Sequence, residues 1–221
     1  MKVIGISGSP RKDGNTEILV REALKPFYEK GWEVTEFFLS SKTINPCTGC
    51  ETCRETGKCV IKGDDMELLI NELGQCDALI IGSPAYYRNV TAQLKALFDR
   101  SFIFFNKKLL AGKPGGAIAV GRGEGGGQSL VLSIIHNYYL SMGALCVPCE
   151  INGLSAKADK PGDILKQENR LRQARVLGEN IINYAEMIAG TSKPCRSITP
   201  NRSRFHAIMD CGFYYFTGNL V

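Results

Sequence analysis

The chain of 221 residues lacks long apolar segments and has few histidines. No run of eighteen or more apolar residues occurs, so we expect no segment to span a membrane. The first residues, MKVIGISGSP, lack the basic and apolar regions of a secretory signal, which predicts a cytoplasmic protein. The chain has only two histidines and no G-x-S-x-G motif, which disfavours a serine or cysteine hydrolase.

The formal net charge of +5 is concentrated near the C-terminus. Residues 190–221 carry four Lys or Arg side chains and one Asp, which is +3 of the total. We predict a domain over 1–189 followed by a tail that packs on it or on a neighbouring subunit. The few cations of the tail disfavour binding to nucleic acid. The tail is also rich in aromatic residues, namely Phe205, Phe213, Tyr214, Tyr215 and Phe216.

Nine cysteines in a chain without a secretory signal indicate metal or redox chemistry more than disulfides. Four of them form a C-x2-C-x2-C-x5-C motif within the segment 46–60: Cys47, Cys50, Cys53 and Cys59. Two successive x2 steps allow one tight loop to present three thiolates to an iron-sulfur cubane, and the fourth thiol can complete the set. The motif therefore predicts an iron-sulfur cluster.

Zinc is the main alternative, with Cys146 and Cys149 as a second pair of ligands. These two lie on the strand predicted over 145–149, where residues three apart point to opposite faces, and this disfavours a shared ion. We expect Cys76 and Cys146 to be buried as small apolar residues. The sequence assigns no role to Cys149, Cys195 or Cys211.

Short apolar runs alternate with helical patterns along the first 189 residues. The predicted strands cover residues 2–7, 33–39, 78–82, 116–120 and 145–149. The predicted helices cover residues 15–30, 66–73, 91–102, 129–142 and 163–189. Such alternation predicts an α/β fold with a parallel sheet covered on both faces. Ligands of such sheets bind beyond the carboxyl ends of the strands.

The loop Gly8–Thr16 follows the first predicted strand and opens the first helix. Its small residues allow backbone N–H groups to converge on an anion, and Arg11 adds a charged donor. It is not a Walker A loop, because five residues separate Gly8 from Gly14 and no Lys follows. The loop predicts a phosphate site, and the alternative is an ordinary loop capped by Asn15 or Thr16.

Two further loops follow the third and fourth strands. Ser83–Asn89 contains Tyr86 and Tyr87, against which a flat ring can lie, unless both tyrosines pack between helices. Gly121–Gln128 formally contains G-x-G-x-x-G, but it does not follow the first strand and has no acidic partner about twenty residues later. We expect this loop to approach a ring edge, and the alternative is a mobile surface loop.

Three segments, GSPRKDGNT at 8–16, SPAYY at 83–87 and AQLKALFDR at 92–100, resemble the flavodoxin-like NADPH-dependent FMN reductase and multimeric flavodoxin group. Together with the cysteine motif, they resemble the iron-sulfur flavoprotein family. The resemblance implies a five-stranded sheet of order 2-1-3-4-5 that binds FMN. It places the FMN phosphate at Ser7, Ser9, Arg11, Gly14, Asn15 and Thr16. It places the isoalloxazine ring near Pro84, Ala85, Tyr86, Tyr87, Asn89, Gly121, Gly123, Glu124, Gly125 and Gly126.

The resemblance also implies one [4Fe-4S] cluster on Cys47, Cys50, Cys53 and Cys59 and a homo-oligomer, either a dimer or a tetramer. The expected function couples a one-electron carrier such as ferredoxin to a two-electron acceptor such as quinone, oxygen or peroxide. One alternative is an NAD(P)H-dependent FMN or quinone reductase with a structural metal. The other is a redox-responsive binding protein that uses the tail.

Overall fold

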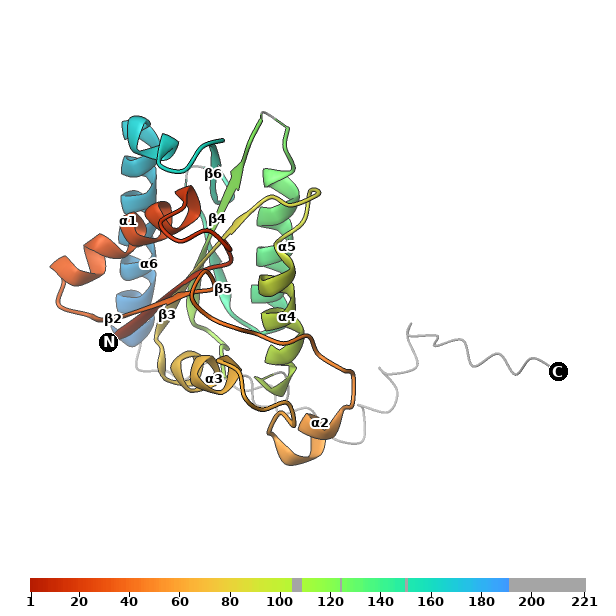
Figure 1. Ribbon diagram of the computed structural model, residues 1–221. Helices are drawn as coiled ribbons and strands as arrows, with labels where there is room; N and C mark the ends of the chain where they lie inside the picture. Colours follow the sequence, from red (N-terminus) through yellow and green to blue (C-terminus); the bar gives the residue numbers. More distant parts are fainter. Residues whose placement is uncertain (105–108, 124, 150, 191–221) are drawn as a thin grey trace, which may run out of the picture. The chain divides into compact units, whose positions relative to one another are not determined.

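The computed structural model describes residues 1–104, 109–123, 125–149 and 151–190 (Figure 1). Parallel strands form the sheet: β1 (Lys2–Ser7), β2 (Glu33–Phe38), β3 (Ala78–Pro84), β4 (Pro114–Gly121), β5 (Leu145–Val147) and β6 (Leu154–Lys157). The main order is β2-β1-β3-β4-β5, and β6 also pairs with β4. The predicted flavodoxin-like order is therefore confirmed.

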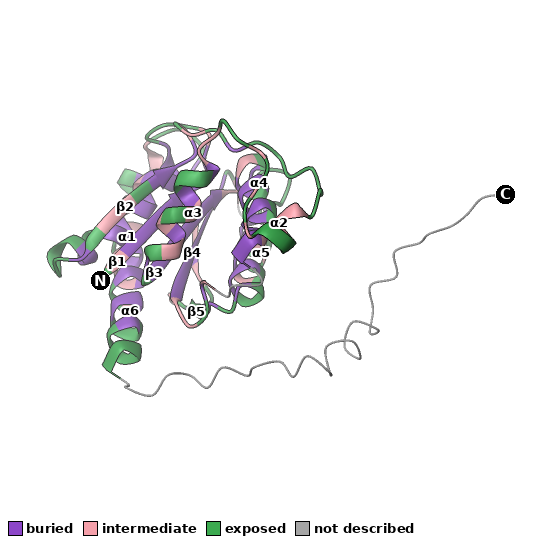
Figure 2. Cartoon of the chain, turned by 90° about the horizontal axis from the view of Figure 1, so that it is seen from below, coloured by how far each residue is buried: buried purple, intermediate pink, exposed green. Residues whose placement is uncertain are grey.

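Helices cover both faces of the sheet, which gives three layers (Figures 1 and 2). α1 (Asn15–Glu29) and α6 (Glu168–Gly190) lie on one face, while α3 (Met66–Gln75), α4 (Ala92–Arg100) and α5 (Gln128–Ser141) lie on the other. Successive residues of β1 alternate between the two cores, since Val3 packs with α1 and Ile4 with α3. This alternation explains why the central strands are apolar on both faces.

The predicted fifth strand is two strands in the structure. β5 pairs with the start of β4, and β6 pairs with its end, Ile118 being opposite Leu154. The prediction over 145–149 is wrong beyond Val147, because Pro148 has no N–H group to continue the ladder. Before β6, a Cβ atom on Gly153 would lie 2.8 Å from the Leu132 side chain, so the chain approaches α5 closely there.

Two helices differ clearly from the prediction. α6 begins at Glu168 rather than at residue 163, because a separate 3-10 turn covers Asp163–Lys166. A short helix missed in the sequence, α2 (Thr52–Thr56), lies inside the cysteine segment. α1 contains Pro26 and ends at Glu29, one residue before the predicted end.

Met1–Gly190 form one compact unit, and the predicted tail beyond Gly190 lies outside the described residues. Within the described ranges, no helix is both long and apolar enough to cross a membrane.

Candidate functional site

A cavity of about 370 Å³ opens at the carboxyl ends of β1, β3 and β4. The lining residues that the sequence predicted are Ser9, Arg11, Gly14, Asn15, Thr16, Pro84, Ala85, Tyr86, Tyr87 and Gly121. The lining residues that it missed are Val120, Arg122, Ala158, Asp159 and Pro161. The fold thus brings the loops after β1, β3 and β4 to one site, and the segment after β6 adds a further wall.

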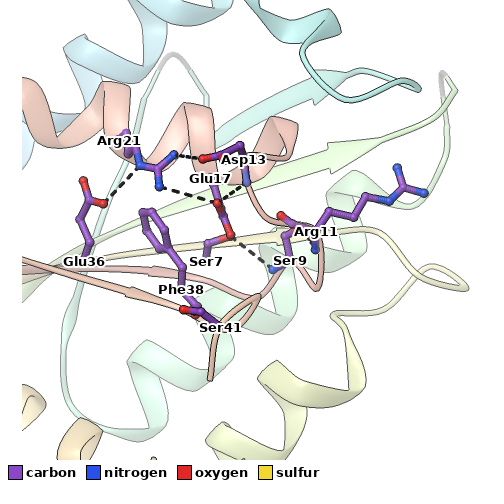
Figure 3. Close-up of polar contacts among 9 residues, drawn as sticks. All are labelled: Ser7, Ser9, Arg11, Asp13, Glu17, Arg21, Glu36, Phe38 and Ser41. Carbon is purple, nitrogen blue, oxygen red and sulfur yellow. Dashed lines mark hydrogen bonds and ion pairs between the residues drawn. The ribbon is translucent and has the colours of Figure 1, made fainter. Parts of the chain in front are cut away.

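The β1–α1 loop (Gly8–Gly14) is shaped by its own hydrogen bonds (Figure 3). Ser9 Oγ accepts the Arg11 N–H at 3.1 Å, and Ser7 Oγ accepts the Ser9 N–H at 3.3 Å. Ser7 is fully buried beneath the loop, while the Arg11 side chain extends away from it. Gly14 is the N-cap of α1 and has no side chain to cover the helix end, so the alternative of an ordinary loop capped by Asn15 or Thr16 is wrong. The N-terminus of α1 thus has no side-chain cap, and its first residues, Asn15 and Thr16, line the cavity, which is the arrangement by which a helix N-terminus can bind an anion.

A network of charged side chains not predicted from the sequence holds the end of this loop against α1 (Figure 3). Asp13 has a positive φ of 53°, and its N–H donates to Glu17 Oε2 at 2.7 Å. The Glu17 side chain is 1% exposed. Arg21 bonds Asp13 at 2.8 Å and Glu36 at 3.2 Å. A Glu at the third helical position is a known N-terminal signal, and here it holds the residue before the N-cap.

Both ends of the Asn15 side-chain amide make hydrogen bonds within the protein. Its Nδ2 donates to the Lys160 carbonyl at 2.9 Å, and its Oδ1 accepts the Ile164 N–H at 3.2 Å. These bonds join the start of α1 to the segment that follows β6.

The side chains of the turn Tyr86–Asn89 are exposed. Tyr86 and Asn89 exchange backbone hydrogen bonds of 2.9 and 3.0 Å, and Tyr87 and Arg88 have φ values of 48° and 61°. This type I′ geometry is unfavourable for residues other than glycine, asparagine and aspartate, and such strain is concentrated at functional sites. Tyr87 is fully exposed and Tyr86 is 44% exposed, so the alternative that they pack between helices is wrong.

The glycine-rich loop after β4 packs against this turn. A Cβ atom on Gly127 would lie 2.6 Å from Arg88 Cα, so only glycine allows the approach. Gly121 lines the cavity, whereas Gly125 lines a neighbouring hollow. Gly123 and Gly126 form a turn through a 3.2 Å backbone hydrogen bond. Glu124 lies outside the described residues.

A basic groove adjoins the cavity. Two hollows of about 420 and 560 Å³ share Lys157 and Arg170, and the second shares Arg122 and Asp159 with the cavity. The cationic side chains that line them are Arg88, Arg122, Lys157, Lys166 and Arg170. Asp159 and Asp163 offset part of this charge, so the groove remains net positive.

The four motif thiols, Cys47, Cys50, Cys53 and Cys59, line one small hollow together with Arg100. Cys47 and Cys50 are exposed, and the other two are half-buried against the apolar core. Positive φ values at Gly49, Glu51 and Gly57 produce the tight wrap. All four motif cysteines therefore border the same hollow.

Hydrogen bonds surround the two thiols at the exposed end of this hollow. The Gly49 N–H donates to Cys47 Sγ at 3.4 Å. Hydrogen bonds from Thr52 lower the pKa of Cys50. Burial raises the pKa of Cys53, and the neighbouring thiols add to the effect. Four sulfur donors suit a soft metal centre. Within the described part of the chain, no three His, Cys, Asp or Glu side chains are close enough to hold a metal ion.

The remaining described cysteines do not join this group. Cys76 is buried as expected, and burial raises its pKa to about 11. Cys146 is exposed, so the prediction that it is buried is wrong; β5 is the edge strand of the main order. Cys146 Sγ donates to His136 O of α5, and Cys149 Sγ to Gln173 O of α6. They therefore face opposite sides of the sheet, as expected, and do not form a pair.

The loop that leads into α4, which contains Tyr86 and Tyr87 of the cavity lining, and the cysteine segment lie at opposite ends of α4 (Figure 1). The Tyr86–Asn89 turn precedes its N-terminus, and Arg100, which lines the cysteine hollow, is its last residue. Nine helical residues span about 13 Å at 1.5 Å per residue. The two sites of one chain are therefore well separated.

The sequence is similar to those of known proteins. An iron-sulfur flavoprotein of Methanocaldococcus jannaschii is 42% identical over 192 residues, which cover 85% of this chain and 99% of the relative. An iron-sulfur flavoprotein of Methanosarcina thermophila is 40% identical over 148 residues, which cover 66% and 77%.

Solved structures show the same fold. RosB has a TM-score of 0.70 at 14% identity and covers 100% of this chain and 91% of its own. The NADH:FMN oxidoreductase EMOB has a TM-score of 0.58 at 20% identity, with 87% and 91% covered. At such identities the likeness concerns the fold alone. The model of the family described as NADPH-dependent FMN reductase matches residues 1–158. The chain therefore belongs to the NADPH-dependent FMN reductase family and, with its cysteine motif, to the iron-sulfur flavoproteins, and it is a flavin-dependent oxidoreductase.

Proposed function

We propose that the chain binds FMN in the cavity and one [4Fe-4S] cluster on Cys47, Cys50, Cys53 and Cys59, and that it couples a one-electron carrier to a two-electron acceptor. The observation that carries this proposal is the convergence of four thiols on one hollow of a flavodoxin-like chain. A single zinc ion would need sulfurs about 2.3 Å from one centre. A cubane is held by four cysteine thiolates, and the C-x2-C-x2-C-x5-C spacing places all four on one short segment.

The FMN phosphate would lie at the N-terminus of α1, where Ser9, Arg11, Gly14 and Thr16 line the cavity. Ser7 and Asn15 would support the phosphate site indirectly. The Ser7 side chain hydrogen-bonds the β1–α1 loop, and the Asn15 side chain hydrogen-bonds the opposite wall of the cavity. The ring would lie against Tyr86 and Tyr87. The other predicted ring neighbours, all on the surrounding loops, are Pro84, Ala85, Asn89, Gly121, Gly123, Glu124, Gly125 and Gly126.

FMN exchanges electrons in pairs or singly, and an iron-sulfur cluster exchanges one at a time. The polypeptide supplies position and charge, and no side chain needs to act as a nucleophile. The basic groove suits an acidic one-electron carrier of the ferredoxin kind. The two-electron acceptor would be a small molecule such as quinone, oxygen or peroxide.

The separation of the two sites along α4 favours a homo-oligomer, dimer or tetramer, in which the cluster of one chain approaches the FMN of another. An NAD(P)H-dependent FMN or quinone reductase with a structural metal is the second candidate, because the basic groove also suits a phosphorylated nucleotide. Stoichiometric bleaching of the flavin by NADPH would favour that candidate. The residues of the tail, on which a redox-responsive binding protein would rely, lie outside the described part.

The proposal is tested by an anaerobic visible spectrum of the full chain before and after dithionite, together with iron, sulfide and FMN assays. We expect one FMN and four iron and four sulfide per chain. Zinc without sulfide would overturn the cluster assignment, and iron without flavin would remove the coupling of one- and two-electron steps.

A further inference from the structure

A buried ion pair closes the base of the cysteine segment. Arg100, at the end of α4, pairs with Asp64, and each side chain is only 1% exposed. Arg100 also lines the hollow of the four thiols. Burying two charges costs desolvation free energy, which apolar side chains at this end of α4 would avoid.

Arg100 joins both ends of the segment 46–60. Its Nη1 donates to the carbonyl of Asn45 at 3.3 Å, just before the segment, and its Nη2 donates to the carbonyl of Ile61 at 3.2 Å, just after it. The planar guanidinium is suited to such a fork, which a lysine cannot reproduce. The two ends of the segment are therefore fixed relative to each other by one side chain.

Asp64 extends the same support to α3. Its Oδ2 accepts the Asn45 N–H at 2.9 Å, and its Oδ1 accepts the Met66 N–H at 3.2 Å. Although burial alone would raise the pKa of Asp64, hydrogen bonds from Arg100 and from these N–H groups lower it. Asp64 is therefore ionised at neutral pH and keeps Arg100 in place.

One nitrogen of Arg100 makes no hydrogen bond within the described part of the chain. Its Nε is buried and has no hydrogen-bond partner at normal distance among the residues that the structure describes. Arg100 and Cys59 line the same small hollow. Burial would lower the pKa of Arg100, but hydrogen bonds to Asp64 and Cys59 raise it. An unpaired buried donor calls for an explanation, and a group bound to Cys59 would supply the acceptor.

We propose that Arg100 is a positioning residue for the metal centre: it holds both ends of the cysteine segment and donates an N–H to the sulfur of Cys59, which raises the reduction potential of the cluster. This inference rests on the proposed function. Hydrogen bonds to cluster sulfurs and nearby positive charge stabilise the reduced, more negative state. Arg100 distinguishes Cys59 from the other thiols, since no comparable buried cation lines the hollow beside Cys47 or Cys50 among the described residues.

The test compares the cluster potentials of full-length proteins, reconstituted anaerobically with iron, sulfide and FMN, by redox titration followed by electron paramagnetic resonance. Arg100→Gln alone leaves the Asp64 charge buried and unpaired, so the test variant is Arg100→Gln with Asp64→Asn. The matched control is Lys58→Gln, which removes an exposed charge next to Cys59. The FMN potential of each protein is an internal reference.

We expect the double variant to bind iron but to have a lower cluster potential than wild type, with an unchanged FMN potential. We also expect it to release iron to a ferrous chelator at least ten-fold faster. Lys58→Gln should leave both quantities near their wild-type values. A double variant with full iron content and an unchanged cluster potential overturns the role of Arg100, as does an equal shift in the Lys58 variant.

If the double variant does not fold, Arg100→Lys decides the question, because lysine keeps the charge but loses the fork and the Nε–H group. A lower cluster potential is again expected, and an unchanged one overturns the inference. A wild-type protein that binds no iron and sulfide would instead overturn the proposed function and this inference with it. The two failures are therefore distinguishable.

Discussion

The side-chain amide of Asn15 donates a 2.9 Å hydrogen bond to the carbonyl of Lys160, which lies 145 residues farther along the chain. Asn15 is only 8% exposed, and the other end of its amide accepts the Ile164 N–H. The bond joins the two walls of the cavity, one formed by the β1–α1 loop and the other by Ala158, Asp159 and Pro161. Asn15 therefore determines the width of the site through contacts within the protein.

Replacing Asn15 with Ala should weaken both folding and FMN binding. The variant leaves the Ile164 N–H unsatisfied in a buried position, which costs about 1–3 kcal/mol in the free energy of unfolding. FMN affinity should fall by roughly ten-fold, since about 1.4 kcal/mol corresponds to that factor. Urea unfolding and fluorescence titration with FMN measure the two effects. Asn137→Ala, on an exposed position of α5, is the control, and equal losses in both variants would contradict the assignment.

Glu17 should matter for FMN binding although it does not line the cavity. Its carboxylate accepts the Asp13 N–H and holds Asp13 at positive φ (Figure 3). Glu17→Ala removes this acceptor from a buried site, and we expect FMN affinity to fall by about ten-fold. Glu17→Gln keeps an acceptor oxygen and should retain the affinity within about three-fold. If Gln is as damaging as Ala, the charge of Glu17 and its ion pair with Arg21 matter more than the hydrogen bond to Asp13.

The strands and the position of the cavity could be predicted because both follow from local patterns, whereas the order of the sheet was implied by the resemblance to flavodoxin-like proteins. β-branched runs such as Lys2–Ser7 and Ala78–Pro84 identify buried strands, and the loops after them must meet at one edge of a parallel sheet. The cysteine spacing likewise specified a single loop. Local periodicity thus accounts for the layers and for most of the cavity lining.

The wall after β6 could not be predicted, because the strand Leu154–Lys157 has only four residues and pairs with β4 through a long-range contact. The exposure of Cys146 depends on its place at a sheet edge, which residue composition does not reveal. The support of the β1–α1 loop could have been found, since Glu17 stands three positions after the N-cap Gly14, as in a capping box. Arg100 and Asp64 are 36 residues apart, and only the fold brings them together.

Acid and alkali should both weaken the contact between Lys2 and Glu72. Hydrogen bonds to Glu33 and Glu72 raise the pKa of Lys2, and the bond from Lys2 lowers the pKa of Glu72. The contribution of Glu72 to the free energy of unfolding is complete above its ordinary pKa of 4.5 and is lost as the pH falls through its lower pKa in the folded protein. The contribution of Lys2 is complete below its ordinary pKa of 10.5 and is lost as the pH rises through its higher pKa in the folded protein.

Glu72→Gln should therefore lower the free energy of unfolding by about 1 kcal/mol at pH 7, because Glu72 is partly buried and also accepts a hydrogen bond from Thr35. The difference from wild type should shrink as the pH falls below 4.5, because Glu72 then becomes protonated first in the unfolded chain and, at its lower folded pKa, in the folded protein. Urea unfolding at pH 3.5, 7 and 9 measures it. Glu67→Gln, an exposed carboxylate on the same helix, should show less effect. A deficit in Glu72→Gln that is independent of pH would contradict the ion-pair explanation.

Cys53→Ala should abolish the cluster while FMN remains bound. Cys53 is the central thiol of the motif and packs against the core, but the segment 46–60 lies at the far end of α4 from the cavity. Iron and sulfide should fall to background, and the flavin spectrum and FMN content should stay at wild-type levels. Cys146→Ala removes an exposed thiol outside the motif and should leave both cofactors in place. Loss of FMN together with the cluster would mean that the cysteine segment also shapes the flavin site, as it would if one chain completes the cavity of another.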